Sequence, residues 1–203
     1  MDTSLTAKRT HGFTESVIRE MTRVAKEHNA INLSQGFPDF PAPQILKDAA
    51  CEAIRDDINQ YAITWGSDSI REALVKKYED WYGIILDGNQ EITVTCGATE
   101  AMVSSMLAAI NPGDEVIVIQ PFYENYGPDV ILSGAIPIFL TLEAPEFRID
   151  HDHLASLITD RTRAIVINTP NNPTGRVFDR SELESIADIC RSHNLLAITK
   201  PTH

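Results

Sequence analysis

The spacing of apolar residues divides the chain into a helical first part and an alternating second part. Apolar residues recur at helical spacing in residues 14–28, and amphipathic patterns predict two further helices over residues 44–56 and 67–82. Residues 31–43 are rich in proline and glycine, which excludes a long regular element and predicts a shaped, extended loop. The first part of the chain is therefore expected to consist of helices joined by loops.

From residue 91 onward, short apolar runs alternate with amphipathic ones. We predict strands in the apolar runs, which cover residues 91–97, 115–120, 136–142, 163–169 and 195–199. The runs between them predict helices over residues 98–110, 122–135, 151–158 and 179–194. The last of these opens with a capping box formed by Asp179 and Glu182. Strands that are apolar throughout are typical of a parallel sheet covered by helices on both faces, so the predicted fold class is α/β.

The composition excludes some classes of function but does not identify one. The formal net charge of −12 argues against a nucleic-acid surface, because phosphate backbones require a basic patch. No apolar stretch is long enough to span a bilayer, and we expect no membrane association. The three cysteines lie far apart and show no metal-binding spacing, so we expect reduced thiols, no metal site and a cytoplasmic location.

Ligands of parallel α/β sheets bind at the carboxyl ends of the strands, so the loops that follow the predicted strands carry the candidate chemistry. In the first, CGATE, Gly97 permits close backbone approach to a ligand. The N–H groups of Ala98 and Thr99 begin the following helix and could hold a phosphate, helped by the helix dipole. The alternative is a plain strand-to-helix turn capped by Thr99.

Two further loops offer an aromatic face and a pair of amides. In QPFYENY, Phe122 and Tyr123 could stack on a flat ring, or could simply cover the core. In NTPNNPTG, two prolines stiffen a loop in which Asn171 and Asn172 supply amide donors and acceptors, so one amide could be held against a ligand oxygen. The alternative is an Asx-turn loop that only ends the strand.

Two positions in the first part of the chain carry weaker signals. Tyr61, in the loop NQYAITWGS, has a phenol that could donate to a phosphate, although loop aromatics usually serve packing. The backbone N–H of Gly36, in SQGFPDF, could meet a carboxylate.

Taken in order, the motifs SQGFPDFP, NQYAITWGS, CGATEAM, PFYENY and NTPNNPTG resemble those of class I pyridoxal-phosphate-dependent aminotransferases of fold type I. The branch that acts on kynurenine, glutamine or methionine is the most similar, because of the QGFPDFP loop. The resemblance implies an N-terminal arm and partial small domain in residues 1–45. It implies an incomplete three-layer α/β/α large domain, mainly of parallel strands, that binds the cofactor in residues 46–203. It also implies amino acid and 2-oxo acid substrates, and a homodimer in the full-length form.

The resemblance further implies roles for the residues that match the family's cofactor site. Gly97, Ala98 and Thr99 would hold the phosphate of pyridoxal 5′-phosphate, and Tyr123 would stack on its pyridine ring. Asn172 would hydrogen-bond the 3′-oxygen of the ring and help to seat the substrate carboxylate.

Outside that loop cluster, Gly36 would contact the substrate through its backbone, and Tyr61 would reach the phosphate of the neighbouring subunit. Some members of the branch carry a tryptophan near the position of Ile18 to recognise an aromatic side chain. The isoleucine argues against a kynurenine-like preference.

The resemblance stops at Thr199. Family members continue with Asp-Glu-x-Tyr, whose aspartate pairs with the pyridine nitrogen, whereas this chain reads Lys-Pro-Thr-His over residues 200–203. The Schiff-base lysine, further phosphate ligands and the carboxylate-binding arginine of the family lie further along. We therefore expect a C-terminally truncated, catalytically inactive chain with no catalytic residue of its own. We do not expect Lys200 to replace the missing lysine, because a frayed terminus offers neither desolvation nor fixed geometry.

Two alternatives to an aminotransferase stay open at this point. One is a non-catalytic fragment that binds the cofactor weakly or pairs with a full-length subunit. The other is a carbon–sulfur lyase, since lyases share this fold and these loops.

Overall fold

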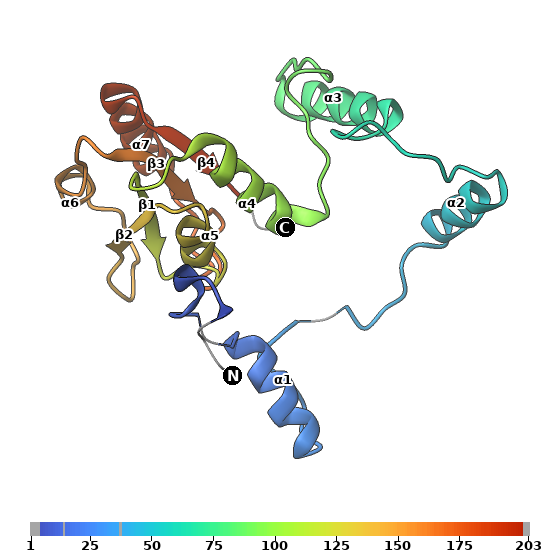
Figure 1. Cartoon of the computed structure of the whole chain (residues 1–203), viewed down its shortest axis with the longest axis horizontal. Coiled ribbons are helices and arrows are strands. Elements are labelled where there is room, and N and C mark those ends of the chain that lie inside the picture. The colour runs from blue at the N-terminus through green and yellow to red at the C-terminus, as the bar shows by residue number, and fades with distance from the viewer. Residues whose placement is uncertain (1–4, 14, 37, 201–203) are drawn as a thin grey trace. The chain divides into compact units, whose positions relative to one another are not determined.

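The computed structural model describes residues 5–13, 15–36 and 38–200. By its internal contacts the chain divides into two compact units, one containing residues 1–13 and 96–203 and the other residues 14–95 (Figure 1). We call them the sheet unit and the helical unit and describe each by itself. The predicted division at residue 45 concerns the domains of the whole fold, and it stays a prediction.

The sheet unit is built on four parallel strands in the order β2-β1-β3-β4. The strands are β1 (Glu115–Gln120), β2 (Ile136–Thr141), β3 (Thr162–Ile167) and β4 (Leu196–Thr199). The helices are α4 (Gly97–Ala109), α5 (Tyr126–Leu132), α6 (His151–Ser156) and α7 (Arg180–His193), with a short 3-10 helix, η2 (Lys8–Thr10). The predicted parallel α/β sheet is confirmed.

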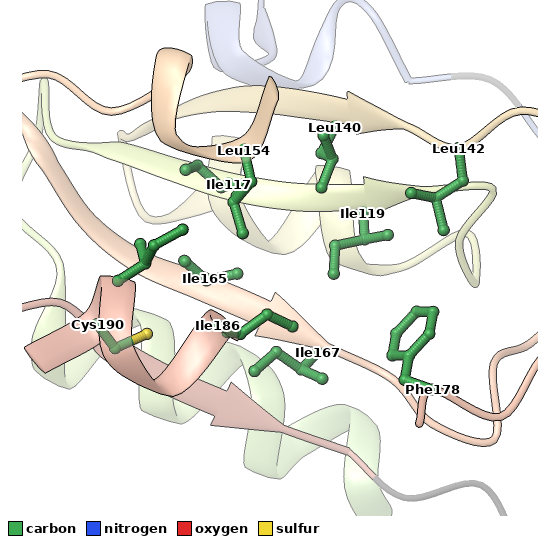
Figure 2. Close-up of a cluster of buried hydrophobic side chains, with 11 residues drawn as sticks. Ile117, Ile119, Leu140, Leu142, Leu154, Ile165, Ile167, Phe178, Ile186 and Cys190 are labelled. Carbon is green, nitrogen blue, oxygen red and sulfur yellow. The ribbon is translucent and has the colours of Figure 1, made fainter. Parts of the chain in front are cut away.

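The central strands β1 and β3 are buried on both faces of the sheet, and their successive residues point to opposite sides. On one side, Ile117 and Ile165 belong to a cluster that includes Leu154 of α6 and Ile186 of α7 (Figure 2). On the other side, neighbouring positions in the same strands pack against α4 and α5 in a second cluster, which includes Met106, Val116, Val118, Val130 and Val166. The result is the expected three-layer arrangement, with β4 at one edge of the sheet.

Two predicted elements differ from the structure. Residues 91–97 form no strand: Val94 donates its N–H to the Trp65 carbonyl at 3.0 Å, but the described residues offer this segment no neighbouring strand. The helix expected over residues 122–135 is shorter and begins at Tyr126. Pro128 therefore lies in the first turn of α5, where proline is tolerated, and does not interrupt the helix.

The helical unit contains α1 (Val17–Glu27), α2 (Gln44–Arg55) and α3 (Asp68–Tyr82), which confirms the three predicted helices within a few residues. Among the described residues of this unit only Arg71 is buried. Its guanidinium donates to the carbonyls of Gly66 and Gly88, at 3.0 and 2.6 Å, and pairs with Asp68. Large apolar side chains such as Trp81 remain exposed, so the unit has no hydrophobic core of its own.

Candidate functional site

Three loops and a strand end meet at the carboxyl edge of the sheet, and hydrogen bonds join them. The Asn125 side-chain amide donates to the Thr99 hydroxyl at 3.2 Å, which ties the start of α4 to the loop after β1. The Asn171 amide donates to the Pro121 carbonyl at 3.3 Å, which ties the loop after β3 to the same loop. Asn168 donates to the Lys200 carbonyl at 2.6 Å, which adds the end of β4.

The start of α4 lies in the motif CGATE, whose backbone N–H groups are the predicted phosphate donors. The helix begins at Gly97, whose φ of +83° is a left-handed conformation that favours glycine. A Cβ built there would meet nothing within 4 Å, so the space beside this residue is open. The N–H groups of Ala98 and Thr99 lie in the first turn, where no intrahelical acceptor is available. A carboxylate oxygen of Glu100 already accepts from the Cys96 N–H, a contact that the sequence did not suggest.

Both aromatic candidates are partly buried and pack against the second core cluster, but they contact different rings. Phe122 stacks on Phe139 with 5.6 Å between ring centroids, so it serves the core, as the alternative interpretation held. Tyr123 is half-buried and meets Tyr126 edge-on, with 6.0 Å between centroids. The ring of Tyr123 therefore remains the candidate for stacking.

The two adjacent asparagines differ in their surroundings: the side chain of Asn171 is buried and hydrogen-bonded, and that of Asn172 is exposed. Asn171 is buried, and its side-chain oxygen accepts from both the N–H and the hydroxyl of Thr174, at 3.2 and 2.8 Å. Asn172 donates its backbone N–H to the Asn168 side chain at 2.8 Å, while its own side chain is exposed and has no hydrogen-bond partner among the described residues. The loop thus fixes the backbone of Asn172 and leaves its side-chain amide without a partner among the described residues.

The end of β4 is better fixed than expected. Lys200 donates its N–H to the Ile167 carbonyl at 2.9 Å, and its own carbonyl accepts from Asn168. Lys200 lies just past β4, which ends at Thr199, and these two hydrogen bonds hold its backbone beside β3. Residues 201–203 lie outside the described part of the chain. The Lys200 ammonium lies 4.6 Å from the centroid of the Tyr123 ring.

Two buried polar groups beneath these loops were missed by sequence reasoning. The Tyr126 hydroxyl and one carboxylate oxygen of Asp129 are buried and have no hydrogen-bond partner among the described residues. Burial raises the pKa of Tyr126 to about 12 and that of Asp129 to about 6, although the Lys200 charge lowers the latter. An acid inside the otherwise apolar run GPDVIL was the signal available for Asp129.

The remaining predicted residues belong to the helical unit. Gly36 and Tyr61 are both exposed there, and Tyr61 has no contact that covers its ring. The strand-end loops belong to the sheet unit, so these two residues are described apart from them. Among the described residues, no group of His, Cys, Asp and Glu is arranged to hold a metal ion, and no helix is long and apolar enough to cross a membrane.

Comparisons with known proteins agree on one family. The family model described as "Aminotransferase class I and II" matches residues 28–200. Methionine aminotransferase from Escherichia coli (strain K12) is 38% identical over 184 residues, which are 91% of this chain and 48% of that protein. Human kynurenine–oxoglutarate transaminase 1 is 35% identical over 212 residues, covering 98% of this chain and 50% of that protein.

A solved structure shows the same fold. N-succinyldiaminopimelate aminotransferase from Mycobacterium tuberculosis superposes with a TM-score of 0.91 at 39% identity, covering 96% of this chain and 51% of that one. The chain spans about half the length of the curated relatives it matches.

Proposed function

Because this chain belongs to the family of class I and II aminotransferases, we propose that the protein takes part in transferring amino groups between an amino acid and a 2-oxo acid. The family uses pyridoxal 5′-phosphate. The observation that carries the proposal is a set of hydrogen bonds at one edge of the sheet. They join the start of α4 and the loop of Asn172 to the loop that contains Tyr123.

The strand-end residues fit this cofactor. Open space beside Gly97 and the N–H groups of Ala98 and Thr99, which have no intrahelical acceptor, suit a phosphate, and the dipole of a 13-residue helix favours its charge. A cavity of about 200 Å³ lies beside this turn, between α4 and the end of β4; Ala98 and Lys200 line it, whereas Tyr123 and Asn172 do not. When bound, the cofactor supplies an electron sink for chemistry at the substrate Cα.

In the proposed site, each residue of the chain has a distinct task. Ala98 and Thr99 would hold the phosphate beside Gly97 through their backbone N–H groups. The ring of Tyr123 would stack on the cofactor ring and exclude water from one face. The Asn172 amide would donate to the ring's 3′-oxygen and help to orient the substrate carboxylate. These tasks match the exposed amide of Asn172 and the exposed first turn of α4.

The proposal also gives roles to two residues of the helical unit. Gly36 would donate its N–H to the substrate, and Tyr61 would reach the phosphate of the neighbouring subunit in a homodimer. Support comes from the exposure of both residues, since Tyr61 keeps its whole side chain accessible. A cytoplasmic location stays a prediction.

We further propose that these 203 residues by themselves hold the cofactor without turning over substrate. In the described sheet unit the lysines are Lys8 and Lys200, and the Lys200 ammonium is engaged with aromatic rings. Mixed with pyridoxal 5′-phosphate, methionine and 2-oxoglutarate, the chain should form glutamate no faster than the same mixture without protein. Saturable glutamate formation that Asn172→Ala abolishes would show that the chain alone is an enzyme.

A further inference from the structure

Lys200 lies on the aromatic ring that the proposed function assigns to the cofactor. Its ammonium is 4.6 Å from the centroid of Tyr123 and 5.7 Å from that of Tyr126. A cation over the face of an aromatic ring is attracted by the negative potential of that face. A flat ligand that stacks on the same face of Tyr123 must displace the ammonium.

The backbone of Lys200 is fixed, so its side chain starts from a defined point. The N–H of Lys200 donates to the Ile167 carbonyl at 2.9 Å, and its carbonyl accepts from the Asn168 amide at 2.6 Å. Asn168 is itself buried and also accepts from the Asn172 N–H. The lysine is thus held by the same network that positions the proposed ligand-binding loop.

A buried acid on α5 adds an electrostatic reason for this position. Asp129 is only 5% exposed, and its Oδ2 has no hydrogen-bond partner among the described residues. The charge of Lys200 acts on this carboxyl and partly offsets the effect of its burial. An unsatisfied carboxylate in a buried setting attracts a nearby cation more strongly than it would in water.

We propose that Lys200 is an internal competitor for the ring site: it covers Tyr123 in the ligand-free chain and leaves when a flat aromatic phosphate binds. The proposal rests on the proposed function, since it assumes that the ligand ring stacks on Tyr123. Its phosphate would still bind at the start of α4, so the competition concerns the ring and not the phosphate.

The test uses pyridoxine 5′-phosphate, which keeps the ring and the phosphate but has no aldehyde to react with lysines. Binding to the whole 203-residue chain is measured by calorimetry for the parent, Lys200→Met and Lys200→Arg. Lys200→Met removes the charge at similar length and should bind about threefold to fivefold more tightly, the factor expected from losing one exposed cation–π contact. Lys200→Arg keeps a cation over the ring and should remain within about twofold of the parent.

A second readout needs no ligand. In the free parent chain, ring currents should move the NMR signals of the Lys200 ε-methylene protons upfield, and Tyr123→Leu should return them toward ordinary values. An ordinary shift in the parent overturns the competition. So does parent binding that Lys200→Met leaves unchanged or weakens. If no variant binds pyridoxine 5′-phosphate, including Lys200→Met, the proposed cofactor site fails together with the competition.

Discussion

Replacing Asn172 by alanine should weaken the binding of pyridoxine 5′-phosphate about tenfold, the cost of losing one hydrogen bond to a polar ligand group in a formed site. The expectation follows from the loop geometry: the Asn172 backbone is fixed by Asn168, while its amide is exposed and has no partner among the described residues. Because that amide contributes no internal contact, the free energy of unfolding should change by less than about 0.5 kcal/mol. Calorimetry and urea denaturation measure the two quantities.

The neighbouring Asn171 provides a matched control with the opposite signature. Its side chain is buried and bonds to Thr174 and to the Pro121 carbonyl. Asn171→Ala should therefore lower the free energy of unfolding by about 2 kcal/mol, because buried partners lose their hydrogen bonds. The assignment of Asn172 to ligand binding is contradicted if Asn172→Ala binds as tightly as the parent, or if it loses as much stability as Asn171→Ala.

Replacing Asp129 by asparagine should stabilise the chain near neutral pH and have little effect in acid. Burial raises the pKa of Asp129 to about 6, whereas an aspartate in the unfolded chain titrates near about 3.9. The folded chain therefore holds this proton more tightly than the unfolded chain does. As pH rises from about 4 to 6, the unfolded carboxyl ionises first, and the free energy of unfolding falls.

The size of this effect is obtained by comparing the free energies of unfolding of the parent and Asp129→Asn at two pH values. Between about pH 4 and about pH 7.5, the advantage of Asp129→Asn over the parent should grow by about 2 kcal/mol. Any constant effect of the amide cancels in that comparison. Urea denaturation at both pH values measures it, with Asp160→Asn, a replacement of an exposed aspartate, measured alongside as a control. An advantage that stays constant with pH would mean that Asp129 is not held in a buried, poorly solvated position.

The layered sheet was predictable because its strands are apolar on both faces. In β1, Val116 and Val118 face one helix layer, while Ile117 and Ile119 face the other, so an uninterrupted apolar run indicates a central strand. The capping box at α7 was equally visible, and the structure has both of its hydrogen bonds. Both features depend on residues that are close together in the sequence, so the sequence alone is enough to predict them.

The errors in the fold arose where an element depends on distant partners. Residues 91–97 have β-branched alternation, but a strand exists only when another strand pairs with it, and composition does not reveal that partner. Arg71 shows the same limit. A charged residue in an amphipathic helix predicts exposure, yet carbonyls of Gly66 and Gly88 and the Asp68 carboxylate surround its guanidinium.

At the candidate site, the sequence motifs identified the loops. They did not show which residues of each loop are buried and which are exposed. Adjacent asparagines look equivalent in sequence, and only the fold separates the buried Asn171 from the exposed Asn172. The same holds for Phe122, which stacks on Phe139, and Tyr123, which meets Tyr126 edge-on. The contact between Lys200 and Tyr123 joins residues far apart in the chain, so no local pattern could predict it.

The central claim is that the start of α4 and the loops beside it form one phosphate-and-ring site. An NMR titration of the chain labelled with ¹⁵N, with pyridoxine 5′-phosphate as the ligand, tests it most directly. We expect saturable shifts with one affinity at the amides of Gly97, Ala98 and Thr99, accompanied by shifts at Tyr123 and the Asn172 side chain. Inorganic phosphate should shift only the three amides of α4. Shifts that leave these amides unmoved, or that spread over the surface without saturating, would contradict the claim.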